Sequence, residues 1–154
     1  MSTMPLEQRL KVLEDIEDIR KLKAAYCRAC DNDHHPKEVI ELFAKDGIWE
    51  ADGIGKFEGL DEIYQYMADL RASGRIRNSA HNVFNPTIEV DGDSATGHWR
   101  LLMLYTANTT AGDIEYFRII GRYVEKYSRE IDGWKFKHLH CYVEEHAEYS
   151  VNED

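Results

Sequence analysis

Residues 77–106 read RNSAHNVFNPTIEVDGDSATGHWRLLMLYT, and this stretch decides the fold class. After Gly74 the spacing of apolar residues changes from helical to a period of two, which is typical of β-strands. Asp91-Gly92-Asp93 stands between two such runs and has the residue types of a hairpin turn. The stretch therefore predicts two long antiparallel strands, at about 77–90 and 95–106.

The same pattern continues toward the C-terminus. Extended runs lie at about 114–128 and 134–144, and Asp132-Gly133 marks the turn between them. We expect these runs and the two before them to form one antiparallel sheet of long strands.

The first half of the chain has helical periodicity. Apolar residues from Leu6 onward recur every three or four positions, which predicts an amphipathic helix to about Cys30, with Asp31 near its C-terminal end. Pro36 suits the first turn of a short second helix that continues to about Ala44, and a third helix is expected at about 60–72.

Short extended pieces are expected at 48–51 and 56–57, between the second and third helices. Helices followed by long antiparallel strands are typical of an α+β fold. A curved sheet wrapped around a helical layer forms a cone with one open, apolar-lined end. Such an end suits a small hydrophobic molecule.

Composition narrows the class of protein. The 154 residues have the length of one domain, with a core expected over about 6–145 and a polar C-terminal tail. A net charge of −10 disfavours nucleic acids and anionic membranes as partners. No apolar run has the roughly 20 residues of a membrane span, and the N-terminus lacks the apolar core of a signal peptide. Three cysteines without a disulfide spacing favour the cytoplasm.

Asp31 and His81 are the first candidates for chemistry. The ordinary interpretation of Asp31 is a surface or turn carboxylate at a helix end, and that of His81 is a surface or satisfied core residue. A carboxylate beside an imidazole, however, orients the ring, selects its tautomer and raises its basicity. Only the fold can bring the two residues together, and we expect them to meet at hydrogen-bonding distance in one pocket.

The other histidines and the cysteines show no complete metal-site spacing. His34-His35 lies in a polar turn, and Cys27-x-x-Cys30 lies inside the first helix, where core packing is the ordinary interpretation. His138-x-His140 places two rings on one face of a strand, but a metal site there needs a third ligand that the sequence does not identify. We therefore expect no metal ion. Nucleotide-loop, Gly-x-Ser-x-Gly and His-Glu-x-x-His motifs are lacking too.

Several short motifs, taken in order, resemble one family. They are LFAKDGIW at 42–49, GIGKFEG at 53–59, VDGD at 90–93, GRY at 121–123 and DGWKF at 132–136. With them, the chain from Leu6 to about Tyr142 resembles a SnoaL-like member of the NTF2-like superfamily. The similar branch holds hexachlorocyclohexane dehydrochlorinase, bile acid 7α-dehydratase and scytalone dehydratase. The resemblance implies an NTF2-like (cystatin-like) cone of three N-terminal helices packed on a curved, mostly antiparallel sheet.

The resemblance also implies roles for single residues. In those lyases a His is the base and an Asp at the end of the first helix is its partner, and His81 and Asp31 stand at the matching positions. Tyr26 matches a catalytic-site Tyr of the bile acid enzyme. The implied substrate-binding residues are Trp49, Leu101, Met103, Ile119 and Leu139. Leu139, flanked by His138 and His140, replaces an arginine that helps chloride to leave in the dehydrochlorinase.

The function implied by the resemblance is a cofactor-independent lyase. It would eliminate a hydroxyl or similar group from a small hydrophobic, cyclic or steroid-like alcohol. Three alternatives stay open: an isomerase or cyclase that uses the same pair, a non-catalytic ligand-binding module, and an accessory subunit like the β subunit of a ring-hydroxylating dioxygenase. The related lyases imply a homo-oligomer, either a trimer or a dimer.

Overall fold

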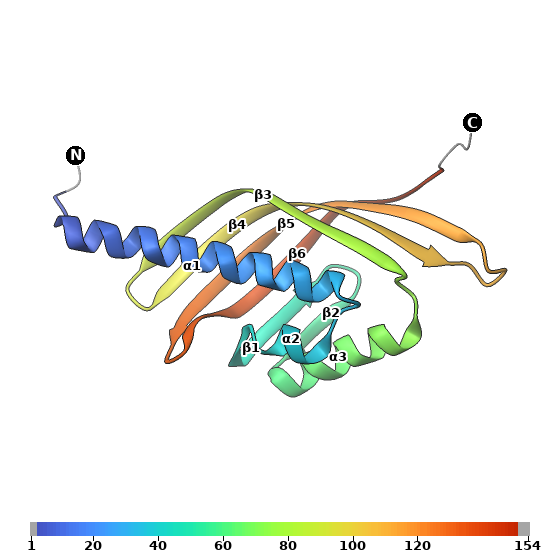
Figure 1. Cartoon of the computed structure of the whole chain (residues 1–154), viewed down its shortest axis with the longest axis horizontal. Helices are drawn as coiled ribbons and strands as arrows, with labels where there is room; N and C mark the ends of the chain where they lie inside the picture. Colours follow the sequence, from blue (N-terminus) through green and yellow to red (C-terminus); the bar gives the residue numbers. More distant parts are fainter. Residues whose placement is uncertain (1–2, 151–154) are drawn as a thin grey trace.

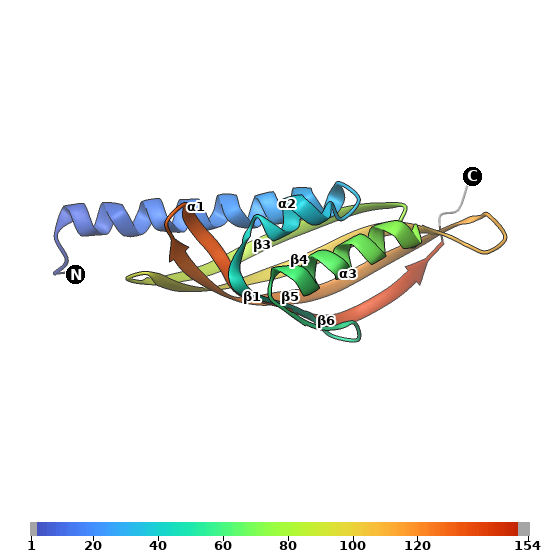
Figure 2. The ribbon, with the colours of Figure 1, turned by 90° about the horizontal axis from the view of Figure 1, so that it is seen from below.

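The computed structural model describes residues 3–150. Its helices are α1 (Leu6–Asp31), α2 (Pro36–Ile40) and α3 (Leu60–Ser73). Its strands are β1 (Phe43–Ala51), β2 (Gly55–Glu58), β3 (Asn78–Asp91), β4 (Ser94–Asn108), β5 (Ile114–Glu130) and β6 (Gly133–Tyr149). In Figures 1 and 2 the long helix α1 lies along a curved sheet, and α2 packs beside α3 and the end of α1.

The sheet has six strands in the order β2-β1-β6-β5-β4-β3. The four long strands β3 to β6 pair antiparallel with their neighbours, as their alternation and turn motifs predict. Strands β1 and β2 also pair antiparallel, whereas β1 pairs parallel with β6. The expected α+β fold with a curved, mostly antiparallel sheet is confirmed.

The expected three helices packed as one N-terminal group are only partly right. The chain has one long helix and two shorter ones, and the extended pieces expected between the second and third helices are strands β1 and β2 of the same sheet. The second helix ends at Ile40 rather than near Ala44, because Phe43 already pairs with Phe136 on β6. The two rings are buried against each other with centroids 5.2 Å apart. This long-range packing outweighs the local preference for a helix.

Only the later turns of α1 enter the core. Leu6, Leu10 and Leu13 remain 74%, 55% and 62% exposed, although they belong to the expected apolar stripe. Both ribbon views show this end of α1 projecting past the sheet. Within residues 3–150, the helices are each too short or too polar to pass through a membrane.

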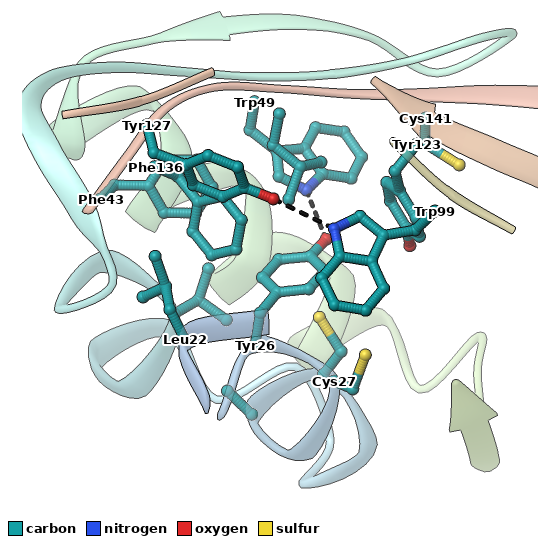
Figure 3. Close-up of a cluster of buried hydrophobic side chains, with 14 of the residues drawn as sticks. Leu22, Tyr26, Cys27, Phe43, Trp49, Trp99, Tyr123, Tyr127, Phe136 and Cys141 are labelled. Carbon is teal, nitrogen blue, oxygen red and sulfur yellow. Dashed lines mark hydrogen bonds between the residues drawn. The ribbon is translucent and has the colours of Figure 1, made fainter. Parts of the chain in front are cut away.

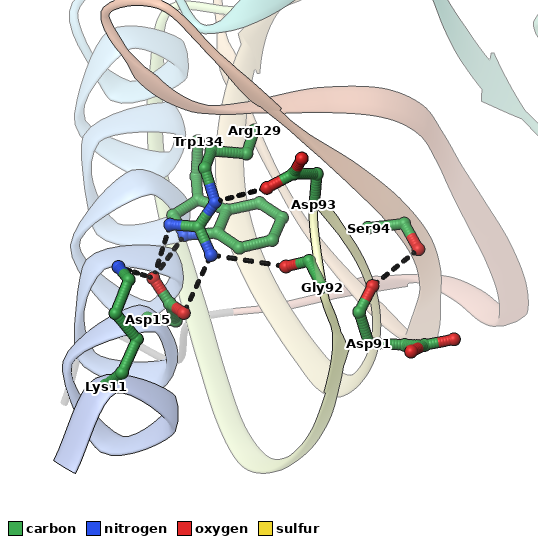
Figure 4. Close-up of polar contacts among 8 residues, drawn as sticks. All are labelled: Lys11, Asp15, Asp91, Gly92, Asp93, Ser94, Arg129 and Trp134. Carbon is green, nitrogen blue, oxygen red and sulfur yellow. Dashed lines mark hydrogen bonds and ion pairs between the residues drawn. The ribbon is translucent and has the colours of Figure 1, made fainter. Parts of the chain in front are cut away.

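An ion-pair cluster fixes α1 to the ends of two hairpins (Figure 4). The Arg129 guanidinium donates to both carboxylate oxygens of Asp15, at 2.7 and 2.8 Å, and to Asp93 at 2.9 Å. The Trp134 indole N–H adds a third donor to Asp15 at 3.1 Å. The hydrogen bond from Arg129 outweighs the effect of burial and lowers the pKa of Asp15 to about 2. Asp15 is thus a carboxylate at every ordinary pH.

The core between α1 and the sheet is rich in aromatic rings (Figure 3). Tyr26 on α1 packs edge-on against Phe136, with ring centroids 5.5 Å apart. Beneath these rings the fully buried Lys23 contacts Glu125, whose other carboxylate oxygen accepts from the Tyr127 hydroxyl. Because both ions are buried together and hydrogen-bonded, each offsets the desolvation cost of the other.

Candidate active site

A cavity of about 370 Å³ lies between the helices and the inner face of the sheet. This volume falls within the range of small-molecule sites. Most of the lining is apolar or aromatic. Six of the residues predicted from the sequence line it: Tyr26, Trp49, His81, Leu101, Met103 and Ile119.

Asp31 is the last residue of α1 and is held by donors from β3. Its Oδ1 accepts from the Ser79 hydroxyl at 2.9 Å, and both of its oxygens accept from the His81 backbone N–H, at 3.1 and 3.0 Å. Burial raises the pKa of Asp31, but the hydrogen bonds and the charge of His81 outweigh burial, so the pKa lies below its usual value. Asp31 is therefore held as a carboxylate in a fixed orientation.

The expected contact between Asp31 and His81 is present. The His81 Nδ1 lies 2.6 Å from Asp31 Oδ1, and the His81 side chain is only 6% exposed. A carboxylate accepts hydrogen bonds only, so this geometry assigns the ring proton to Nδ1. The lone pair is then on Nε2, which has no hydrogen bond to another residue in the part of the chain that the structure describes. This arrangement suits a general base.

Tyr26 and Trp49 form one polar contact in the aromatic wall of the cavity. The Trp49 indole N–H donates to the Tyr26 hydroxyl at 2.7 Å, which Figure 3 shows as a dashed line. Burial is the main cause that raises the pKa of Tyr26 well above its usual value. The Tyr26 oxygen accepts from Trp49 and its own proton points to the Cys30 sulfur, so a substrate oxygen must replace Cys30 as the acceptor of that proton.

His34, which the sequence places in a polar turn, lines the cavity. It is 7% exposed, and its ring meets that of His81 edge-on with centroids 6.0 Å apart. Burial and the nearby His81 lower the pKa of His34 to about 4, so it is neutral at pH 7. Asp33 and His34 both have left-handed backbone angles, with φ of 55° and 49°. This unusual turn directs His34 inward, and no sequence motif indicates it.

Two further polar groups reach the cavity without a sequence signal. Arg75, in the connection between α3 and β3, lines it and has no ion-pair partner within residues 3–150. The Tyr105 hydroxyl lies 2.6 Å from Nε2 of His146, and both residues line the cavity as well. The cavity thus combines apolar walls with the Arg75 cation, the His81 ring and the Tyr105–His146 pair.

Leu139 does not line the cavity. It is fully buried beside Trp49, its partner on β1, in the closed part of the core. Cys141 and Val143, two and four positions further along the same face of β6, line the cavity instead. The cavity therefore begins two residues further along β6 than the predicted position, Leu139.

The fold and the cavity define an NTF2-like cone with a polar pair on its wall. Residues 11–140 match the family model of the SnoaL-like domain, so the chain belongs to the SnoaL-like family. The resemblance stated from the sequence motifs is therefore confirmed. No curated protein matches the chain by sequence.

Solved structures share this fold. A type 2 hexachlorocyclohexane dehydrochlorinase matches with a TM-score of 0.78 at 19% identity, over 95% of this chain and 94% of its own. A Novosphingobium aromaticivorans protein assigned as a scytalone dehydratase has a TM-score of 0.78 at 19% identity, over 91% of each chain. A second protein from that organism, assigned as an aromatic ring hydroxylase, has a TM-score of 0.79 at 20% identity, over 89% of this chain and 94% of its own. At such identities the likeness shows the fold alone.

Proposed function

We propose that this protein is a cofactor-independent lyase that eliminates a hydroxyl or similar group from a hydrophobic cyclic alcohol. One observation carries the proposal: His81 Nδ1 lies 2.6 Å from the Asp31 carboxylate while the His81 ring lines an apolar cavity. A module that only binds an apolar ligand gains nothing from such a pair, since desolvating polar groups costs free energy.

In this proposal His81 is the general base. Its Nε2 takes a proton from a carbon next to an activating carbonyl, and the ring becomes an imidazolium. Asp31 stabilises that imidazolium through Nδ1 and keeps the ring oriented. Acid–base assistance of this kind is typically worth about 10²–10⁴-fold in rate.

The departing oxygen needs donors as its bond to carbon breaks. Tyr26 supplies a hydrogen bond rather than its whole proton, because its raised pKa keeps the phenol protonated. The proton that completes the leaving water comes from the His81 imidazolium. Arg75, which lines the cavity without an ion-pair partner in the described chain, stabilises negative charge on a substrate oxygen.

The substrate in this proposal is a compact ring system with one or two oxygens. Neighbouring aromatic rings support this choice: Trp49 and Tyr66 are tilted against each other with centroids 4.9 Å apart, and Tyr66 stacks on Phe57 at 4.4 Å. An aromatic wall offers apolar area to a flat or cyclic ligand. The homo-oligomer implied by the family resemblance belongs to the same proposal.

Isomerisation is the second candidate, and the Tyr105–His146 pair favours it. The pair lies in the same cavity as His81, so a proton taken at one carbon can be returned at another without water entering. Elimination and isomerisation share the first step and differ in whether the oxygen leaves.

To test the proposal, the protein is incubated with a panel of cyclic β-hydroxy ketones and steroidal alcohols. Each reaction is followed by ultraviolet absorbance and mass spectrometry. A lyase yields a new conjugated chromophore and a loss of 18 mass units for water, whereas an isomerase changes absorbance at constant mass. His81→Ala is expected to abolish turnover of any substrate found while the protein stays folded by circular dichroism. Full turnover by folded His81→Ala protein would refute the proposed base.

A further inference from the structure

Two histidines and one carboxylate cluster on the outer face of the sheet, and a second carboxylate, Asp52, reaches them from the edge of the cavity. Side chains alternate along a strand, so Glu50 on β1 and His138 and His140 on β6 lie opposite the face that carries the buried Trp49. Asp52 directly follows β1 and completes the group. The proposed lyase mechanism uses none of these four residues.

The parallel pairing of β1 and β6 brings the ligand atoms together. Glu50 is the register partner of His140. Its Oε2 lies 2.8 Å from His138 Nε2 and 3.5 Å from His140 Nδ1. These three atoms all lie within 4.8 Å of one another. In a tetrahedral zinc site with bonds of about 2.0–2.1 Å, ligand atoms are about 3.3 Å apart, so only small side-chain movements are needed.

Asp52 fixes the orientation of the His140 ring. Its Oδ1 lies 3.1 Å from His140 Nε2, and its Oδ2 accepts from the Val143 backbone N–H at 3.1 Å. The proton of a neutral His140 is therefore on Nε2, and the Nδ1 lone pair faces Glu50 Oε2. Two acceptors that face each other repel unless a proton or a metal cation lies between them. A carboxylate that orients a histidine in this way is typical of metal sites.

The charges around the cluster permit a cation. Lys56 on β2, the register partner of Glu50, is paired with Glu58 at 2.8 Å, so their charges offset each other. Lys126 on β5 is opposite His138 and adds one positive charge. With Glu50 and Asp52 ionised, the local balance is about −1, in a chain of net charge −10.

We propose that Glu50, His138 and His140 bind a zinc ion, with Asp52 as the residue that orients His140. Two imidazoles and one carboxylate are ligands that Zn²⁺ accepts, whereas Ca²⁺ and Mg²⁺ favour sites made wholly of oxygen. Three protein ligands leave one position for water. The ion joins β1 to β6 across their parallel pairing and stabilises the folded chain by mass action.

A second group of potential ligands lies inside the cavity: Cys30, His34 and His81, with ligand atoms also within 4.8 Å. One observation disfavours it. Burial raises the pKa of the Cys30 thiol far above its usual value, whereas zinc binds the thiolate. The experiment must nevertheless distinguish the two groups.

The full chain is stripped with a chelator, desalted and titrated with Zn²⁺ against a chromophoric chelator. We expect one zinc per chain. Glu50→Gln, His138→Ala and His140→Ala should each weaken binding by more than about 100-fold, and Asp52→Asn by about 10–100-fold. His98→Ala removes an exposed strand histidine outside the cluster and should change nothing. Thermal unfolding checks that each variant is folded.

X-ray absorption at the zinc edge identifies the ligands in the wild-type protein. Only nitrogen and oxygen ligands, at about 2.0–2.1 Å, are expected. Sulfur at about 2.3 Å, or loss of binding in His81→Ala, would place the ion in the cavity and overturn the proposal. Binding that no cluster variant weakens, or no zinc binding by wild-type protein, would overturn it too.

Discussion

Helix α1 carries two ionised aspartates with basic partners, and the partners differ in what they can do. Asp15 meets Arg129 through two hydrogen bonds and Trp134 through a third, and its side chain is 3% exposed. Asp31 meets His81 at the end of the same helix and is 30% exposed. Both carboxyl groups have pKa values below the usual range. For Asp15 the hydrogen bond from Arg129 alone outweighs burial, whereas for Asp31 burial is the largest single influence on the pKa and only the hydrogen bonds and the charge of His81 together outweigh it.

The partner distinguishes the roles of the two pairs. An arginine stays charged at every ordinary pH and forms a rigid fork, so Asp15–Arg129 can only hold the hairpins onto α1. A histidine gains and loses a proton near neutral pH, so Asp31–His81 can move a proton. A lowered carboxylate pKa alone therefore does not identify a catalytic site. The titrating partner and the cavity beside it do.

Asp31→Asn tests whether the Asp31–His81 pair moves a proton during turnover. The amide can still accept from Ser79 and the His81 backbone, but it lacks the charge that stabilises an imidazolium. We expect turnover to fall by about 100-fold, with little change in substrate binding and in the unfolding midpoint. Steady-state kinetics and thermal unfolding measure both effects. If substrate binding were lost but turnover of bound substrate were kept, Asp31 would be a binding residue only.

Asp15→Asn is the matched change in the other pair. It removes the charge facing Arg129, and we expect a loss of about 2 kcal/mol in the free energy of unfolding. For a chain of this size that lowers the midpoint by about 4–8 °C. Turnover at 25 °C should stay unchanged, since the pair lies outside the cavity. A loss of turnover in folded Asp15→Asn protein would mean that the two pairs are coupled through α1.

The pH dependence of stability gives a third test. Asp15 has a pKa of about 2 in the folded chain against an ordinary value of 3.8. Its contribution is fully present above pH 3.8 and is lost as the pH falls through about 2. We expect the stability difference between wild type and Asp15→Asn to shrink by about 2 kcal/mol between pH 5 and pH 2. Urea unfolding at several pH values measures this difference. If the unfolding free energies of wild type and Asp15→Asn ran parallel over this pH range, Asp15 would have an ordinary pKa in the folded chain.

Much of the fold could be predicted because it depends on local patterns. The two-residue alternation and the Asp-Gly turns predicted the four long strands, and the helical periodicity predicted α1 to within one residue of its end. The extent of β1 could not be predicted. Phe43 and Ala44 look helical alone and become a strand through pairing with β6, a contact over ninety residues away in sequence.

The residues of the candidate site also fall into those that the sequence predicts and those that it does not. Asp31 and His81 could be named because motifs around them resemble a family. His34 and Arg75 could not, because an irregular turn and a short connection place them in the cavity. Glu50 could not be joined to His138 and His140 either, since the parallel register of β1 on β6 sets that distance. Register and irregular turns depend on the whole chain and not on neighbouring residues.

Arg75→Gln is expected to have the smallest effect on stability and turnover, and it compares the role of Arg75 with that of Arg129. Arg129 makes several ion pairs in the cluster, whereas Arg75 has none in the described chain and lines the cavity. Because the Arg75 side chain is exposed and has no ion pair in the described chain, Arg75→Gln should change the free energy of unfolding by no more than about 0.5 kcal/mol.

If the charge of Arg75 stabilises a substrate oxygen in the transition state, turnover of Arg75→Gln should fall by about tenfold. The ratio of wild-type turnover to Arg75→Gln turnover should shrink as salt is added, because salt screens the exposed charge of Arg75. Unchanged turnover at low salt would remove Arg75 from the mechanism and leave Tyr26 as the donor to the departing oxygen.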